Sequence, residues 1–514
     1  MPRQRTTLSR RMLLKGATAG AGVLLLDRAG AGRAAASTWS STIAPYVLPT
    51  ADGVETTAIL TVGEAAPNGY RMVGIPDGLG VVAGDRDFTL VMNHELRATN
   101  GVMRSHGSKG AFVSRWTIDP RSLRVTSGRD NLGSPASVHL WDAAAGGYTD
   151  HTTSFDRFCS ADLADPKAFR HGARGTDARI LLNGEEVTGG RAFAHIVTGP
   201  GAGEAWQLPR LGRMSFENAV TSPHGKDRTI VVGLEDGSIN TAPVIANNPS
   251  EVYVYVGEKQ SAGTPIERAG LTNGKLHGVR VRRSGLVVGQ ESDAFGLGDA
   301  GTGYVGVAEF ELAELGASGD VSAWSGAELE TDAIANDVFR CQRAEDGAWD
   351  PRGDRRGDFY FVTTANMTSN TRLWRLRFTD IERPEAGGTI EILVNASAGR
   401  MFDNIAVDQL GRLLLQEDPG NETHLAKIWV YGIESRELIE VAHHDPALFS
   451  PGTDPARFIT QDEESSGIID AQEVLGQGWF LFDVQVHKTN PDSELVEFGQ
   501  LLAMYVHPRI GRSP

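Results

Sequence analysis

The sequence is poor in cysteine and in long apolar runs. Its 514 residues hold only two cysteines, Cys159 and Cys341, with no CxxC pair and no His/Cys spacing of a zinc site. A chain of this length does not need disulfides to fold, and one bridge between the two cysteines remains open. Beyond residue 36 no apolar stretch is long enough to cross a bilayer, so we expect no membrane span. Walker A and G-x-S-x-G motifs are also absent from the sequence.

Positive charge is scarce as well, and much of it sits at the N-terminus. The start "LSRRMLLKG" carries the pair Arg10 and Arg11, followed by a short apolar run and by "RAAAS". This order predicts a twin-arginine export signal over residues 1–36, cut near Ala36, with a single domain over 37–514. A basic tail or a membrane anchor is the plainer interpretation, but Gly16–Leu26 is too short to span a bilayer.

The remaining chain is strongly acidic. The formal net charge of the whole chain is −16, and the first 36 residues hold seven basic residues and one acidic residue, so removing them leaves about −22. Such a surface repels nucleic acid and anionic membranes, and it repels a phosphate ester unless bound cations reverse the local field. We expect the export machinery and a small molecule as partners, and a periplasmic, cell-envelope or extracellular location. The oligomeric state stays open.

Strand patterns dominate the organisation of the chain. Runs such as "FTLVMNHE", "RTIVVGLED", "EVYVYVGE", "DFYFVTTAN", "TRLWRLRF" and "WFLFDVQVH" are rich in β-branched and aromatic residues and end in Gly, Asp or Asn turns. "VAEFELAEL" is the short helical candidate. The sequence predicts an all-β fold, a β-propeller with loop insertions, with a pair of sandwiches as the alternative.

Acidic residues recur where these strands end. In a propeller the ends of the inner strands share one rim, and bare carboxylates there repel each other by several kcal/mol. Calcium binds six to eight oxygens from Asp, Glu, Asn and carbonyl groups, so the pattern indicates a cation site. The plainer interpretation of any single acid is a solvated turn residue. The candidate metal ligands are Glu95, Glu185, Glu186, Glu217, Glu235, Asp236, Glu345, Asp403, Asn404, Glu417 and Asp418.

One stretch shows the pattern within a single hairpin. In "MFDNIAVDQLGRLLLQED", Asp403 and Asn404 precede one strand, and Glu417 and Asp418 follow the next. Antiparallel neighbours bring the start of one strand beside the end of the other, so these four groups are expected to share one edge.

The order of these motifs resembles the PhoX-type alkaline phosphatases and their uncharacterised relatives. The matching segments are "LVMNHEL", "ILLNGEEV", "LGRMSFENAV", "VVGLEDG" with "SEVYVYVGEK", "RAEDGAWDPRGDRRGDFYFVTTAN", "FDNIAVDQLGRLLLQED" and "FLFDVQVH". The resemblance spans about Val54 to His507. It implies a six-bladed propeller that hydrolyses phosphate monoesters with calcium and iron.

The resemblance also suggests individual roles. Arg343 in "RAED" holds the position of an arginine that clamps the phosphoryl oxygens, and a salt bridge to Glu345 or Asp346 is the structural alternative. His94 adjoins Glu95 and is the second catalytic candidate, or else orients that carboxylate. His487, Gln485 and Asp483 share one face of their strand, which faces either the channel or solvent.

The sequence departs from the family at two positions. The family cysteine that binds iron before the paired glutamates is replaced by Gly184, and the His of its His-Glu pair by Phe216. Calcium, which needs only oxygen ligands, is therefore expected more firmly than Fe³⁺, and no spacing ties Cys159 to the site. A calcium-dependent esterase or lactonase and a non-catalytic, calcium-stabilised binding module remain alternative functions.

Overall fold

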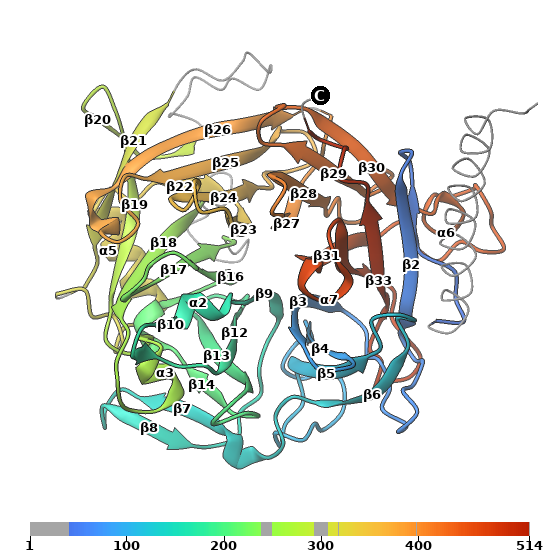
Figure 1. The fold of residues 1–514 in the computed structure, drawn as a ribbon, viewed down its shortest axis with the longest axis horizontal. Coiled ribbons are helices and arrows are strands. Elements are labelled where there is room, and N and C mark those ends of the chain that lie inside the picture. Colours follow the sequence, from blue (N-terminus) through green and yellow to red (C-terminus); the bar gives the residue numbers. More distant parts are fainter. Residues whose placement is uncertain (1–40, 238–248, 292–306, 317, 397, 513–514) are drawn as a thin grey trace, which may run out of the picture.

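Strands make up most of the molecule and surround a central channel (Figure 1). The computed structural model describes residues 41–237, 249–291, 307–316, 318–396 and 398–512. The predicted export signal lies outside these residues. The all-β prediction is confirmed, and the arrangement of sheets around a channel is that of a propeller.

Five sheets of four or more strands form the wall. In hydrogen-bonded order they are β3 (Pro76–Ala83), β4 (Phe88–His94), β5 (Phe112–Ile118) and β6 (Val125–Asp130); β8 (Gly147–Asp150), β7 (Val138–Asp142), β14 (Ala205–Gln207), β13 (Gly190–Thr198), β12 (Arg179–Glu185) and β9 (Phe158–Leu163), with β15 (Arg213–Met214) on β13; β16 (Phe216–Thr221), β17 (Arg228–Glu235), β18 (Pro249–Glu258), β19 (Lys275–Arg283), β21 (Ala308–Glu314), β26 (Gly388–Ala396), β25 (Thr371–Phe378), β24 (Asp358–Thr363) and β23 (Ala344–Trp349), with β20 (Leu286–Val288) and β22 (Arg340–Gln342); β1 (Val47–Pro49), β30 (Leu438–His444), β29 (Lys427–Gly432), β28 (Arg412–Glu417) and β27 (Phe402–Val407); and β2 (Val54–Thr61), β33 (Phe498–Val506), β32 (Trp479–Val486) and β31 (Glu463–Asp470).

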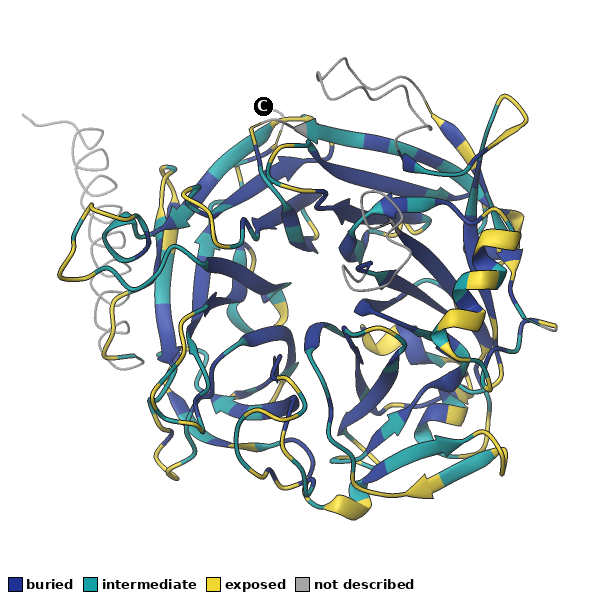
Figure 2. Ribbon diagram, turned by 180° about the vertical axis from the view of Figure 1, so that it is seen from behind, coloured by how far each residue is buried: buried dark blue, intermediate teal, exposed yellow. Residues whose placement is uncertain are grey.

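The remaining elements are small. Strands β10 (Arg170–His171) and β11 (Arg174–Gly175) form a separate hairpin. The helices are α2 (Pro166–Phe169), α3 (Pro265–Arg268), α5 (Gly326–Ala335), α6 (Pro446–Phe449) and α7 (Gln472–Leu475). In Figure 2 the strands around the channel are almost entirely buried, whereas exposed residues lie on helices and turns.

The two ends of the chain close the ring. Strand β2 pairs with β33, so that Val54 faces Val506, and β1 pairs with β30. The fully buried Arg412 adds a second tie, because its guanidinium binds Asp408 at 2.8 Å and donates to the carbonyl oxygen of His507 at 2.9 Å. The start and the end of the chain are therefore fastened to each other and to the neighbouring sheet.

The core lies between adjacent sheets. On β18 the valines at 252, 254 and 256 pack into one apolar cluster, while Tyr253 and Tyr255 pack into another. Successive side chains of a strand point to opposite faces of its sheet. The sheet is therefore covered on both faces, which explains why its strands read as nearly continuous apolar runs.

Six strands line the channel. These inner strands are β3, β9, β16, β23, β27 and β31, and each contacts the next around the ring, with β31 returning to β3 (Figure 1). Each runs along the channel and is followed by its antiparallel partner. The starts of the inner strands therefore lie beside the ends of the second strands at one mouth of the channel.

The helical prediction for "VAEFELAEL" is wrong. This segment is strand β21, which pairs with β19 and β26. Its burial alternates, with Ala308 and Phe310 buried and Glu309 exposed, so the apolar residues have the period of a strand. The one longer helix, α5, follows a capping box formed by Ser325 and Glu328.

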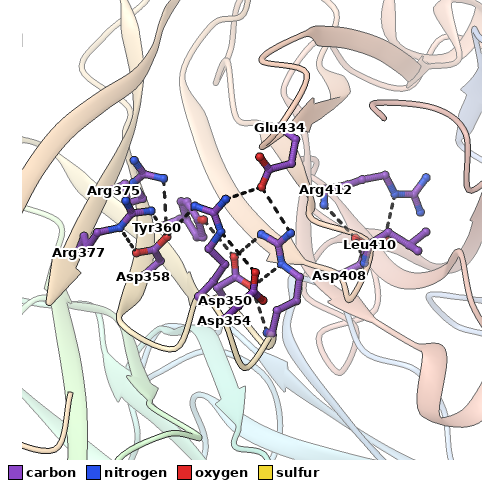
Figure 3. Close-up of polar contacts among 12 residues, drawn as sticks. Asp350, Asp354, Asp358, Tyr360, Arg375, Arg377, Asp408, Leu410, Arg412 and Glu434 are labelled. Carbon is purple, nitrogen blue, oxygen red and sulfur yellow. Dashed lines mark hydrogen bonds and ion pairs between the residues drawn. The ribbon is translucent and has the colours of Figure 1, made fainter. Parts of the chain in front are cut away.

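Ion pairs join two neighbouring sheets on the outside of the ring (Figure 3). The loop after β23 holds Asp350, which binds Arg352 at 2.7 Å, and Arg355, which reaches Glu434 beyond β29 at 2.6 Å. The predicted loop insertion "DRRGD" is thus a link between sheets. Deeper in the same network, Asp358 accepts two hydrogen bonds from Arg377.

Candidate metal centre

Acidic side chains gather at one mouth of the channel. The tips of the inner strands supply Asp77, Cys159, Glu217, Glu345, Asp403 and Glu464. The residues that end or follow the second strands are Glu95, Glu186, Asp236, Thr364, Asp418 and His487. All but one of these twelve residues bears a group that can hold a metal ion.

A repeated backbone bond sets these positions. The amide N–H of each second-strand residue donates to the carbonyl oxygen of the residue two places before the inner-strand tip. Examples are Glu186 to Arg157 at 2.8 Å and Asp418 to Met401 at 3.0 Å. The other four bonds are Glu95 to Ile75, Asp236 to Ser215, Thr364 to Arg343 and His487 to Asp462. One local geometry therefore presents every one of these tips.

Backbone strain marks the same places. Four of the accepting residues, Ile75, Arg157, Arg343 and Met401, have φ between 45° and 62°. A left-handed conformation is costly for residues with a side chain and persists where surrounding structure imposes it, often at functional sites. The strain falls at the entry to the inner strands.

Bulges in the strand pairing then aim the tips. In β23 the residues Glu345 and Asp346 both lie opposite Val362, and in β27 Asp403 and Asn404 both lie opposite Gln416. A bulge turns consecutive side chains away from strict alternation. Each strand can therefore present one acid to the mouth and place a second polar group deeper in the channel.

The tips enclose a cavity of about 420 Å³. Donor atoms of Glu217, Glu345 and Asp403 lie within 4.8 Å of one another, as do those of Asp403, Asp418 and Glu464. Two further groups with the same spacing are Asp77, Glu95 and Cys159, and Cys159, Glu186 and Glu217. Because the four groups share members, they form one continuous set of donors.

The set carries more negative charge than a metal-free protein can hold ionised. Burial and the neighbouring carboxylates raise the pKa of Glu345 to about 8 and that of Glu464 to about 7. The pKa values of Glu217 and Asp403 are raised further in the same direction. Without a cation these groups would have to take up protons to relieve the repulsion.

The donors fit metal ions. Asp403 Oδ1 is buried and has no hydrogen-bond partner among the described residues. Carboxylate oxygens at this density suit calcium, and the Cys159 sulfur adds a soft ligand suited to iron. Burial, with the nearby Asp77 and Glu217, raises the pKa of the Cys159 thiol, whereas a metal ion would favour the thiolate.

Cys159 lies opposite the position where the family cysteine is missing. It enters the mouth from β9, where Cys159 and Ser160 bulge against Gly184 of β12. A Cβ atom on Gly184 would come within 2.3 Å of the Phe216 Cβ, so no side chain fits there. The expectation that Gly184 leaves the centre without a thiol therefore needs correction, since the neighbouring strand brings one to the mouth.

Two arginines reach into the same cavity. Arg343 donates from Nε and Nη2 to the two carboxylate oxygens of Asp236, both at 3.0 Å, and contacts Glu345 at 2.9 Å. Arg157 binds Glu95 and Glu186, each at 2.5 Å. For Glu95, burial would raise the pKa, but the Arg157 guanidinium and the Gln485 amide hold it below its usual value.

A histidine completes the cavity wall. His487 Nδ1 lies 2.8 Å from Glu497, and its Nε2 lies 3.5 Å from Glu464. Burial would lower its pKa, but hydrogen bonds to both carboxylates raise it well above the ordinary value. The fully buried Gln485 donates to Asp77 at 2.9 Å, so this face of β32 points into the channel and not to solvent.

Several predicted residues lie elsewhere. Glu185 is held by the Arg191 guanidinium, and the fully buried Glu417 accepts hydrogen bonds from Trp429, His424 and two backbone N–H groups. His94 is buried, stacks on Phe112 and bonds to Ser114 and Gly74. Burial lowers its pKa to about 3, so its ring is neutral.

Two more predicted ligands stand apart from the mouth. Asn404 points down the channel and donates to Ser160 Oγ at 2.6 Å. Glu235 forms a separate group with Glu251 and Glu330, whose carboxylate oxygens lie within 4.8 Å of one another. The sequence placed these residues near strand ends, but side-chain direction assigns them to other surroundings.

Sequence reasoning missed Asp77, Arg157 and Glu464. Asp77 and Glu464 stand at the starts of "PDGLGV" and "EESSGI", in the same place as the acids of "FENAV", "AEDGAW" and "FDNIAV". Aligning these six short segments on a polar pair followed by small or apolar residues would have found both acids. Arg157 has no such signal, because only the fold brings it to Glu95.

Comparison with known proteins supports this architecture. No protein-family model and no curated protein sequence matches the chain. Among solved structures, Pseudomonas fluorescens PhoX in complex with vanadate matches 91% of this chain and 98% of its own, with 12% identity and a TM-score of 0.60. A luciferin-regenerating enzyme (11% identity, 85% and 92% coverage) and a gluconolactonase of Xanthomonas campestris (10% identity, 87% and 99% coverage) both have TM-scores of 0.33. The predicted resemblance to the PhoX-type phosphatases is thus confirmed at the level of the fold, and this chain is a PhoX-like, propeller-type protein.

Proposed function

We propose that the chain is a metal-dependent phosphomonoester hydrolase that binds calcium, together with iron, at the mouth of its channel. The observation that carries the proposal is the convergence of seven carboxylates and one thiol with two arginines in one cavity. PhoX, which shares the fold, binds vanadate, a transition state analogue. The six inner strands also support a six-bladed propeller, as the resemblance implies.

The residues would divide the binding of metal and substrate between them. Glu217, Glu345, Asp403, Asp418 and Glu464 would hold calcium through oxygen, and Cys159 with Glu186 would hold iron. When bound, such cations neutralise a phosphate ester and lower the pKa of an oxygen nucleophile.

Arg343 is the residue best placed to bind the phosphoryl group. Asp236 fixes its guanidinium through two hydrogen bonds, while the same Nη2 also contacts Glu345. When Glu345 binds a cation, that Nη2 group becomes available to a phosphoryl oxygen. Asp236 is then a positioning residue.

His487 is suited to hold a proton beside the substrate. It lines the cavity, and its two carboxylate partners keep the imidazole protonated at neutral pH. A protonated imidazole at this place can donate to the oxygen of a departing alcohol.

The test combines metal analysis with turnover. The purified protein should contain calcium and iron, hydrolyse p-nitrophenyl phosphate, lose this activity on chelation and be inhibited by vanadate. Arg343→Ala should lower kcat/KM by about 10²–10³-fold, with partial recovery in Arg343→Lys. The matched control is Arg383→Ala, since Arg383 is exposed and pairs only with the neighbouring Asp380. Hydrolysis of lactones or carboxyl esters without phosphatase activity would overturn the proposal, as would a protein without bound metal.

Export through the twin-arginine route belongs to the same proposal. Two observations support it: the Arg10–Arg11 pair, and the need of such a centre to receive its metals before export. Changing both arginines to lysine should retain the protein in the cytoplasm. The described residues include no helix long and apolar enough to cross a membrane.

A further inference from the structure

The channel has a second cavity at its other mouth. It measures about 390 Å³ and is lined by the later residues of the same six inner strands, with α2 and α7 beside it (Figure 1). Hydrogen bonds across the channel separate the two cavities. Asn218 Nδ2 donates to Asp346 at 2.6 Å, and Asn404 Nδ2 donates to Ser160 at 2.6 Å. The second cavity is therefore a distinct site, of a size that small molecules occupy.

Its chemistry differs from that of the metal-binding mouth. Apolar side chains form much of the wall, among them Leu79, Val220 and Trp349. The ionised groups are biased to one sign, with five carboxyl groups and only two cationic side chains, Lys167 and Arg179. Charge complementarity therefore favours a positively charged ligand with an apolar body.

A bare metal ion fits this cavity poorly. Among the described residues, no group of three closely spaced metal-binding side chains occurs here, in contrast to the first mouth. Asp346 is also committed, since it accepts hydrogen bonds from Asn218 and from the backbone N–H groups of Gly347 and Ile405. An isolated carboxylate beside an apolar wall suits an organic cation better than calcium.

Asp162 is the carboxylate placed to meet such a ligand. It accepts a hydrogen bond from the Thr221 N–H at 2.8 Å, which fixes it next to Val220. The indole of Trp349 donates to the carbonyl oxygen of Val220 at 3.3 Å, so the aromatic wall adjoins the same strand. Burial raises the pKa of Asp162 to about 7, and the nearby Asp346 adds to the effect. A cation beside Asp162 would relieve this cost.

We propose that the second cavity binds an organic cation, a primary ammonium group on an apolar chain. The ammonium pairs with Asp162, and the apolar part lies against Val220 and Trp349. This site is independent of the hydrolytic function proposed for the first mouth, because no metal ligand of that mouth lines it.

The test uses n-hexylammonium as the probe, with hexanoate, hexanol and calcium as comparisons. Titration of the metal-loaded protein at pH 8, followed by calorimetry and tryptophan fluorescence, should show saturable binding of one equivalent of hexylammonium. Hexanoate and hexanol should bind at least tenfold more weakly. Asp162→Asn should weaken hexylammonium binding at least tenfold, while the exposed Asp85→Asn should leave it unchanged.

A second variant guards against failure of Asp162→Asn to fold. Glu473 is exposed on α7 and lines the cavity, so Glu473→Lys reverses a charge at the entrance without disturbing the core. It should weaken hexylammonium binding several-fold. The proposal fails if hexanoate binds as well as hexylammonium, if calcium displaces the probe stoichiometrically, or if neither variant changes the affinity. None of these readouts depends on turnover, so they stand whether or not the protein is a phosphatase.

Discussion

The two mouths of the channel are built by opposite ends of the same six strands, yet they differ in kind. The strand starts present acids and a thiol close enough to share ions, whereas the strand ends present apolar side chains with carboxyl groups set apart. The bulges at Glu345 and Asp403 account for part of the difference, because they turn consecutive polar side chains toward the first mouth. The density of donors, more than the number of acids, distinguishes a metal site from an acidic surface.

The largest expected effect comes from removing one shared donor at the first mouth. Glu217 belongs to two of the four donor groups, with Cys159 in one and Asp403 in the other. Glu217→Gln should lower turnover by about 10²–10³-fold and reduce the bound metal, because a neutral amide both binds cations and stabilises charge less well. Elemental analysis and p-nitrophenyl phosphate kinetics measure both effects.

A matched control separates this effect from general loss of charge. Asp85→Asn removes an exposed carboxylate far from either cavity lining and should change neither readout. Unchanged metal content and turnover in Glu217→Gln would remove this residue from the centre.

The sequence predicted the strands well, because most of them carry β-branched and aromatic residues between clear turns. It also placed Glu217, Glu345, Asp403 and Asp418 at strand ends, where the structure brings them into one cavity. It could not separate an acid from its neighbour in the chain. Whether a side chain faces the channel depends on bulges and on arginines contributed by other strands.

Cys159 shows the same limit from the other side. Motif alignment pointed to Gly184, which the structure places against Phe216 with no room for a side chain. The thiol comes from the neighbouring strand, opposite that glycine. Local sequence order carries no record of which residues meet across a sheet, so a ligand that moves to an adjacent strand escapes a motif.

The next largest effect compares two neighbouring acids. Glu417 is fully buried and accepts four hydrogen bonds, whereas Asp418 lines the first cavity. Glu417→Gln should lower the free energy of unfolding by about 1–3 kcal/mol, because an amide N–H₂ would face donors. Asp418→Asn should instead reduce metal binding and change the stability of the metal-free protein by less than about 0.5 kcal/mol. Denaturant unfolding with chelator present measures both, and equal losses of stability would erase the distinction.

The smallest effect concerns pH. The pKa of Glu345 is raised to about 8 and that of Glu464 to about 7, against about 4.3 in an unfolded chain. Between pH 8 and 6 the metal-free folded protein therefore binds more protons than the unfolded chain, so its stability should rise as the pH falls. The gain is on the order of 1 kcal/mol per pH unit for each carboxyl.

The buried histidines act with the opposite sign and at lower pH. The pKa values of His94 and His195 are lowered to about 3 by burial, so they remove stability only as the pH falls below about 6.5. Bound cations should abolish the gain from the carboxyls, since they keep these groups ionised in the folded state. Thermal unfolding at pH 8 and 6, with chelator and with calcium, should show Tm rising toward pH 6 only in the chelated sample. A chelated protein that loses stability over this interval would mean that the acids of the first mouth are relieved by something other than protons or cations.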